Sequence, residues 1–113
     1  MVNNNYKNLE RQSINNALAE TDAFFKQFSE LDTEVYANGA IPKKYKELTG
    51  LAISVLTRCD ECVLYHLQEC IIEEADVKEI FEAVKMGVIG GGSITYPTAR
   101  YAYKMMKELK VVK

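Results

Sequence analysis

Hydrophobic residues recur at three- and four-residue steps along most of the chain, which is the pattern of amphipathic helices. The first run predicts one long helix, whose apolar positions are Ile14, Ala17, Leu18, Thr21, Phe24, Phe25 and Phe28. A short segment over residues 32–37 is expected after it. Asn38 and Gly39 are expected to end this part of the chain, because both residues favour helix termini and turns.

Two further helices are predicted in the middle of the chain. Pro42 suits the first turn of a helix whose apolar positions are Tyr45, Leu48, Leu51, Ala52, Val55 and Leu56. A break over residues 58–60 then places Cys59 at the opening of another helix, which is expected to run to about Glu73.

The last third of the chain predicts two more helices. Asp76 and Glu79 have the spacing of a capping box, which marks a helix start. The glycines at 90–92 are expected to end that helix, and either Ser93 or Thr95 is the expected cap of the final one.

No segment shows the two-residue alternation of a strand, and we find no internal repeat or linker. The predicted fold is therefore all-α, with five to six helices. A length of 113 residues fits one small domain, expected to cover residues 1–113. The composition, 48% hydrophobic and 27% charged, is that of a globular protein in water. Because a chain of this size builds only a modest core, self-association is expected to contribute burial.

Charge and hydropathy narrow the function classes. The formal net charge of −2 provides no basic surface for nucleic acid or an anionic membrane, so neither is expected as a partner. The first residues lack the pattern of a signal peptide, and the longest uncharged run, residues 86–99, is too short to span a bilayer. A cytoplasmic protein is expected. Three cysteines in that compartment indicate reactive or buried thiols rather than a disulfide scaffold.

The candidate chemistry lies between residues 59 and 70. Cys59 and Cys62 have C-x-x-C spacing, and His66, the sole histidine of the chain, follows four residues later. On an ideal helix these three residues and Cys70 fall on one face. Cys62 and His66 are an i, i+4 pair, which brings the imidazole near the sulfur. Because the thiolate is the nucleophile, a helix start and a nearby histidine both favour reactivity, and the interpretation is a redox-active dithiol.

Two other interpretations of these residues stay open. The cysteines and His66 are buried structural residues in one of them. In the other, Cys59, Cys62, His66 and Cys70 bind zinc, although zinc sites usually draw a second ligand pair from a separate loop. Cys70 itself is expected to be a small buried residue rather than a third redox centre.

The segment from Ile41 to Leu48, the run that starts at Leu51, and the Cys59-x-x-Cys62-x-x-x-His66 motif together resemble the AhpD-like alkylhydroperoxidase and carboxymuconolactone decarboxylase family. The resemblance covers about two thirds of the chain. It implies an AhpD-like helical fold that forms trimers or hexamers. The aromatic first helix, with Phe24, Phe25 and Phe28, is a candidate for such contacts.

The resemblance also implies roles for four residues. Cys62 corresponds to the cysteine that attacks the peroxide, and Cys59 to the one that resolves the sulfenic acid. Glu47 and His66 correspond to the family's proton-relay pair. A carboxylate beside apolar helix positions is costly without a partner, which agrees with that role. From the residues alone, Glu47 is also interpretable as a surface residue or as the salt-bridge partner of a lysine.

The expected activity is therefore a thiol-dependent peroxidase that uses hydroperoxides and an unknown dithiol reductant, without metal or organic cofactor. AhpD carries a histidine between its two cysteines, where this chain has Glu61.

A second hypothesis is a decarboxylase, for which Arg58 and Arg100 are the candidate cations. True carboxymuconolactone decarboxylases lack the cysteine pair, so its presence argues against that hypothesis. A third is a non-enzymatic, oligomeric redox sensor.

Overall fold

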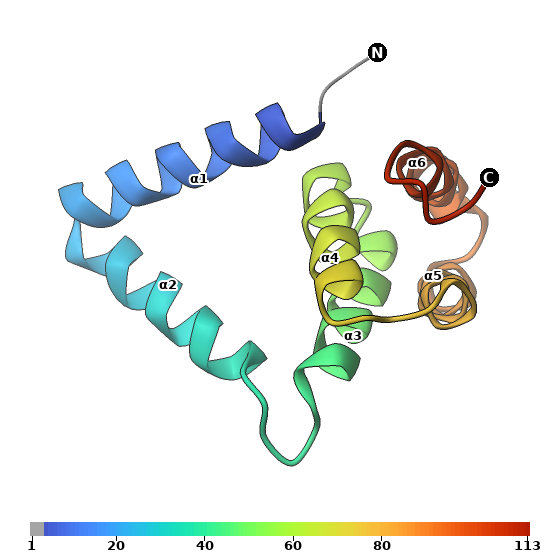
Figure 1. Ribbon diagram of the computed structural model, residues 1–113, viewed down its shortest axis with the longest axis horizontal. Coiled ribbons are helices and arrows are strands. Elements are labelled where there is room, and N and C mark those ends of the chain that lie inside the picture. Colours follow the sequence, from blue (N-terminus) through green and yellow to red (C-terminus); the bar gives the residue numbers. More distant parts are fainter. Residues whose placement is uncertain (1–3) are drawn as a thin grey trace. The chain divides into compact units, whose positions relative to one another are not determined.

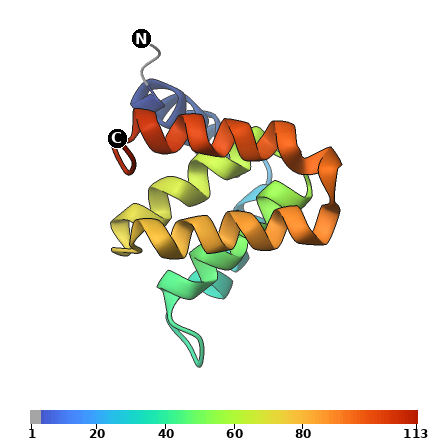
Figure 2. The same ribbon diagram turned by 90° about the vertical axis from the view of Figure 1, so that its right-hand side faces the viewer.

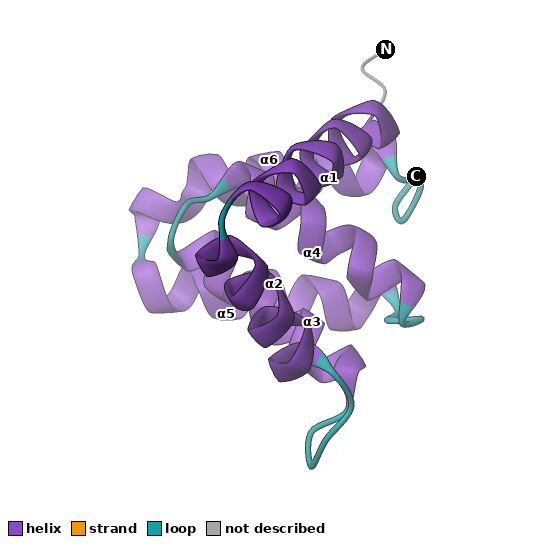
Figure 3. Cartoon of the chain, turned by 90° about the vertical axis from the view of Figure 1, so that its left-hand side faces the viewer, coloured by secondary structure: helices purple, strands orange, loops and turns teal. Residues whose placement is uncertain are grey.

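The computed structural model describes the backbone of residues 4–113 and the side chains from residue 9 onward. Within this range the chain forms six α-helices and one 3₁₀ turn, without a strand (Figure 3). The all-α prediction is confirmed. The elements are α1 (Asn4–Thr21), α2 (Ala23–Tyr36), α3 (Lys43–Leu56), α4 (Asp60–Ile72), α5 (Val77–Gly91), η1 (Ser93–Thr95) and α6 (Tyr96–Glu108).

The chain divides into two compact units, Met1–Ala37 and Asn38–Lys113, each described here by itself. Unit 1 holds α1 and α2, which meet at Asp22 (Figure 1). The expectation of one long helix through Phe28 is wrong at this point. Asp22 has extended backbone angles (φ −143°, ψ 129°), and its side chain accepts a hydrogen bond from the N–H of Phe24 at 2.8 Å. It thus caps a new helix. The separate segment expected over residues 32–37 is also wrong, because α2 continues through most of it.

The apolar side chains of unit 1 are on its surface. None of the residues of α2 is buried. The exposed large apolar residues of this unit recur at helical steps: Leu9, Ile14, Leu18, Phe24, Phe25, Phe28, Leu31 and Val35. Solvent-exposed apolar stripes of this kind are typical of surfaces that another chain covers.

Unit 2 is built around α3, which packs against both α4 and α5, while α6 contacts α4 and α5. Figure 2 shows α5 and α6 side by side, joined by η1. The core draws on all four helices and comprises Leu51, Val55, Val63, Leu64, Leu67, Cys70, Ile80, Ala83, Val84, Ala102, Met105 and Met106. Burial of these residues fixes α3 and α4 against each other, and the candidate site lies on this pair of helices.

The helices α3 and α5 approach closely at Gly87. A Cβ atom at this position would lie 2.7 Å from the carbonyl oxygen of Ala52 and 2.7 Å from the Cβ of Val55. Only glycine allows the two helices to come this near. Gly87 therefore sets the packing of α5 against the helix that carries Glu47.

The start and the end of α5 are set by local signals in the sequence. The side chain of Asp76 accepts the N–H of Glu79 at 2.8 Å, and the side chain of Glu79 accepts the N–H of Asp76 at 3.0 Å. This is the predicted capping box, which is confirmed at the start of α5. The expected break at residues 90–92 is narrower than predicted, because α5 continues to Gly91 and only Gly92, with a φ of 81°, leaves the helix. Thr95 occupies the N-cap position of α6, but no side chain caps this helix, because the Thr95 hydroxyl donates to the carbonyl of Gly92 at 2.7 Å instead. The expectation of a side-chain cap at Ser93 or Thr95 is therefore wrong.

Candidate active site

Cys59 lies in the turn between α3 and α4 and belongs to the ends of both helices. Its N–H donates to the carbonyl of Ser54 at 3.0 Å, and the N–H of Arg58 donates to Val55 at 3.1 Å, which is the Schellman pattern of a helix C-terminus. Arg58 adopts the left-handed backbone that this pattern requires, with a φ of 59°. Cys59 is also the N-cap of α4, where its sulfur accepts the N–H of Cys62 at 3.3 Å. The predicted helix opening at Cys59 is confirmed.

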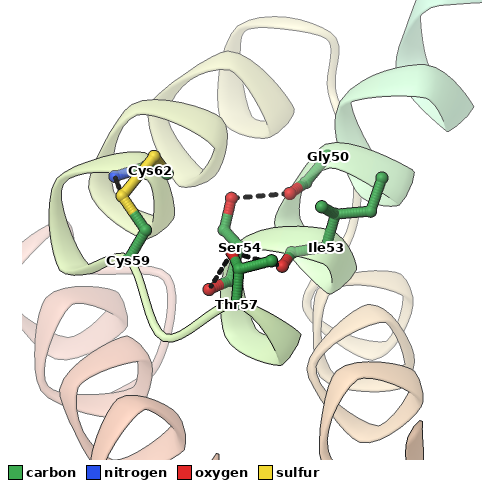
Figure 4. The surroundings of a disulfide bond; sticks show 6 residues. All are labelled: Gly50, Ile53, Ser54, Thr57, Cys59 and Cys62. Atoms are coloured by element: carbon green, nitrogen blue, oxygen red, sulfur yellow. Dashed lines mark hydrogen bonds between the residues drawn. A yellow bond between two sulfur atoms is a disulfide. The ribbon is translucent and has the colours of Figure 1, made fainter. Parts of the chain in front are cut away.

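The sulfur atoms of Cys59 and Cys62 are joined in a disulfide, and the two Cα atoms are 5.2 Å apart. Figure 4 shows this bond at the first turn of α4, beside Ser54 in the last turn of α3 and Thr57, the C-cap of that helix. Cys59 is half-buried, whereas Cys62 is exposed. The structure therefore brings together the two cysteines that the sequence singled out, and Cys62 is the more accessible one.

Burial increases along α4 from Cys62 to Cys70. These two residues and His66 follow at four-residue steps and share one helix face. Cys62 is exposed, the side chain of His66 is 12% exposed, and Cys70 is fully buried. Cys59 caps the helix rather than lying within it. The imidazole is thus placed between the surface disulfide and the core.

Glu47 is buried in α3 and contacts His66 in α4. Its exposed fraction is 0%, so the interpretation of Glu47 as a surface residue is wrong. Its Oε1 atom lies 2.8 Å from Nδ1 of His66. When the carboxylate accepts the Nδ1 proton, the neutral imidazole is held in the tautomer whose Nε2 carries the lone pair. The structure brings together the pair that the resemblance implied.

Lys43 completes the surroundings of the carboxylate. Its Nζ donates to Oε2 of Glu47 at 2.7 Å and lies 3.7 Å from Oε1 of Glu69. Burial disfavours the ammonium group. The hydrogen bond and the charge of Glu47, with the charge of Glu69, outweigh burial and raise the pKa of Lys43 above its ordinary value. The interpretation of Glu47 as the salt-bridge partner of a lysine is therefore correct as well.

Sequence reasoning assigned no role to Lys43. The signal was present in its spacing, because Lys43 and Glu47 are an i, i+4 pair on one helix. Asn38 fixes the start of that helix, since its side chain accepts the backbone N–H of Lys43 at 2.7 Å. Pro42 is the N-cap rather than a residue of the first turn.

Cys70 is a buried thiol, as expected. Burial, together with the negative charges of Glu47, Glu69 and Glu79, raises the pKa of Cys70 to about 12. A thiol in this environment stays protonated and unreactive at neutral pH. Among the side chains that the structure describes, from residue 9 onward, no group of three or more His, Cys, Asp and Glu residues is arranged to hold a metal ion, so the zinc interpretation gains no support.

The profile of the carboxymuconolactone decarboxylase family matches residues 22–108. The chain belongs to this family. The match starts at the capping residue of α2 and ends with α6, so it spans both the apolar stripe of α2 and the whole candidate site.

Solved structures of family members share the fold. A protein from Thermotoga maritima is 37% identical, with a TM-score of 0.86 over 96% of this chain and 95% of that one. A second crystal structure of the same Thermotoga maritima protein is 43% identical, with a TM-score of 0.76 over 79% of this chain and 92% of that one. That protein is described as a carboxymuconolactone decarboxylase family member and a candidate for the antioxidative response. An apo protein from Legionella pneumophila is 28% identical, with a TM-score of 0.79 over 90% of each chain. The AhpD-like fold is confirmed.

Two curated relatives carry no assigned function. An uncharacterised protein from Cupriavidus necator is 32% identical over 69 residues, which are 61% of this chain and 58% of that protein. Uncharacterised protein 4 in the cox locus of Paracoccus denitrificans is 28% identical over 82 residues, 73% of this chain and 74% of that one. The chain thus spans little more than half the length of the first relative. No described helix has both the length and the apolar character required to cross a membrane.

Proposed function

We propose that this family member is a thiol-dependent peroxidase, which reduces hydroperoxides through a Cys59–Cys62 disulfide. The observation that carries the proposal is the hydrogen bond between the buried Glu47 and His66, one helical turn beyond the C-x-x-C pair. A dithiol with an oriented proton acceptor is the arrangement that activates a thiol nucleophile. The antioxidative description of the Thermotoga maritima protein agrees with a role of this kind.

The proton acceptor in the proposed reaction is Nε2 of His66. Glu47 accepts the Nδ1 proton and so keeps the lone pair on Nε2. Cys62 precedes His66 by one turn of α4, at the i, i+4 spacing that places side chains near one another. His66 takes the thiol proton of Cys62 and later delivers it to the leaving alkoxide.

In the first chemical step, the Cys62 thiolate attacks the terminal oxygen of the hydroperoxide. An S–O bond forms, the O–O bond breaks, and the alcohol leaves with the proton from His66. Sulfur is oxidised by two electrons to sulfenic acid. Cys59 then attacks this sulfur, the S–O bond breaks, and water leaves with the thiol proton of Cys59, which closes the disulfide. A dithiol reductant returns both thiols by exchange.

The position of Cys59 suits the reductive half of this cycle. Cys62 is exposed, so a reductant reaches its sulfur first. Cys59 then leaves as a thiolate at the N-cap of α4, where it accepts the N–H of Cys62 and faces the positive end of the helix dipole. A stabilised leaving thiolate departs faster, so the turn favours reduction by attack at Cys62.

We also propose that the chain acts as a homo-oligomer. The supporting observation is the apolar stripe of α2, whose Phe24, Phe25, Phe28, Leu31 and Val35 side chains are exposed. Sedimentation analysis of the wild type and of a Phe28→Glu variant tests this proposal. A wild-type mass above that of the monomer, lowered by Phe28→Glu, is expected. A monomeric wild type contradicts it.

The decisive experiment counts thiols by intact mass and peptide mapping before and after one equivalent of hydroperoxide. The wild type is expected to lose two protons at Cys59 and Cys62 and to regain them with a dithiol. Cys62→Ser should consume no peroxide, and Cys59→Ser should stop at a sulfenic acid on Cys62. Cys70→Ala is the matched control, since that thiol is buried in the same helix and should not be needed.

Three outcomes contradict the proposal. If Cys62→Ser turns over peroxide as fast as the wild type, the nucleophile is wrongly assigned. If the dithiol cycles without turnover of peroxide, the chain is a redox sensor. If a variant without Cys59 and Cys62 acts on a polycarboxylate lactone, the decarboxylase hypothesis replaces it.

A further inference from the structure

Glu47 presents both of its carboxylate oxygens to a partner. Oε1 faces Nδ1 of His66 at 2.8 Å, and Oε2 accepts a hydrogen bond from Nζ of Lys43 at 2.7 Å. The exposed fraction of Glu47 is 0%, whereas the side chain of Lys43 is 26% exposed. The lysine therefore connects a fully buried carboxylate to the protein surface.

A carboxylate at this depth is ionised only with a compensating charge. Burial disfavours the charged form, and a positive charge within hydrogen-bonding distance favours it. If Glu47 were protonated, its proton would go to Oε1 or Oε2, and Nδ1 of His66 would become the acceptor of the hydrogen bond. Nε2 would then carry the proton and could not accept another.

We infer that Lys43 is a positioning residue, whose ammonium group holds Glu47 as a carboxylate toward Nδ1 of His66 and so sets the pH above which Nε2 accepts a proton. The part of this inference that concerns proton transfer from Cys62 rests on the function proposed above. The part that concerns the proton affinity of the Glu47–His66 pair does not.

Other charged and titratable groups around the pair act in both directions. Tyr65, Glu69 and Cys70 lie on α4, and Glu79 lies on α5. The negative charges of Glu69 and Glu79 raise the proton affinity of neighbouring groups. The positive charge of Lys43, 2.7 Å from Glu47, opposes this effect. The carboxylate of Glu69 lies 3.7 Å from the same ammonium group and partly offsets its charge. Lys44, the next residue, is bound to Glu79 instead at 2.9 Å. Lys44 therefore provides a matched control with the same charge on the same helix.

His66 makes the test direct, because it is the sole histidine of the chain and its imidazole signals need no assignment. The ¹⁵N shifts of the ring report both its charge and its tautomer. We would titrate the disulfide form after removal of any histidine tag. Cys59 and Cys62 do not titrate in that form, and the pKa of Cys70, raised by burial to about 12, keeps that thiol protonated.

In Lys43→Met, the Glu47–His66 pair is expected to bind its proton about tenfold more tightly. The midpoint of the His66 titration then moves up by about one pH unit. Lys43→Arg should restore the wild-type midpoint, and Lys44→Met should leave it unchanged. Glu69→Gln should move it the opposite way, because the charge of Lys43 is then less offset. This variant keeps the inference testable if Lys43→Met does not fold.

Equal midpoints in the wild type, Lys43→Met and Glu69→Gln would overturn the inference. A second measurement, the rate of peroxide-driven disulfide formation against pH, separates it from the proposed function. If the low-pH part of the rate profile of Lys43→Met moves to higher pH together with the His66 titration, the result supports both the inference and the proposed function. If the His66 titration moves and the rate profile does not, the electrostatic role of Lys43 stands and its role in proton transfer is wrong.

Discussion

Glu47 and His66 are 19 residues apart in the sequence and 2.8 Å apart in the structure, measured from Oε1 to Nδ1. The contact joins α3 to α4 at the point where one side chain is fully buried and the other is nearly so. A buried carboxylate that accepts an imidazole proton fixes the ring orientation and stabilises the imidazolium once it forms. The pair is therefore suited to take a proton from a thiol on α4.

The first prediction concerns Glu47→Gln. The variant keeps the shape of the side chain but removes the charge that stabilises protonated His66. We expect the rate of peroxide-driven disulfide formation to fall by about 100-fold at neutral pH. Stopped-flow measurement of the reduced protein checks this rate. The control is Glu69→Gln, which removes another carboxylate that lies near Lys43. A similar loss in both variants would show that the charge balance at Lys43, rather than the contact between Glu47 and His66, is responsible.

Most of unit 2 was predictable from local signals. The capping box of Asp76 and Glu79 and the helix opening at Cys59 were both predicted from residue types at fixed spacings, and both are present. Such signals act within a few residues, so the sequence displays them directly. The break at Asp22 was missed because apolar residues keep their helical period on both sides of it. Periodicity alone does not report one residue in an extended conformation.

The candidate site was predictable in its residues but not in its contacts. The C-x-x-C-x-x-x-His pattern points to Cys59, Cys62 and His66 without a structure. The burial of Glu47 depends on how α3 packs against α4 and α5, which no local pattern specifies. Lys43 was overlooked because an i, i+4 lysine and glutamate usually form a weak pair on an exposed helix face. The role proposed for Lys43 follows only from the complete burial of Glu47.

A second prediction concerns Glu61, which lies between Cys59 and Cys62 in the first turn of α4. A negative charge near Cys62 favours its thiol over its thiolate, so Glu61→Gln should increase the thiolate fraction at neutral pH. Because Glu61 is exposed and solvent screens its charge, we expect alkylation of Cys62 to accelerate by only about two- to fivefold. Alkylation rates of the reduced protein against pH check this. Glu82→Gln, an exposed change on α5, is the control.

The third prediction uses the backbone strain at Arg58, which has a φ of 59° directly before Cys59. A residue with a Cβ atom pays for this conformation, and glycine does not. We expect Arg58→Gly to raise the free energy of unfolding by about 0.5–1 kcal/mol. Arg58→Ala removes the same side chain but retains the Cβ atom, so it should not stabilise the protein. Urea unfolding of the disulfide forms checks both variants, and equal midpoints would contradict the prediction.

The last prediction compares two glycines of α5. In Gly87→Ala the new methyl group would meet the Ala52 carbonyl at 2.7 Å, so α5 must move away from α3. We expect a loss of about 1–3 kcal/mol in the free energy of unfolding. Gly90 lies in the same helix with its nearest contact, a methyl of Leu56, at 3.6 Å, and alanine there should stabilise α5 by up to about 1 kcal/mol. Opposite shifts of the urea midpoint are therefore expected. If Gly87→Ala were as stable as Gly90→Ala, the close approach of α3 and α5 would not hold in solution. The position of Glu47 opposite His66 would then need another cause.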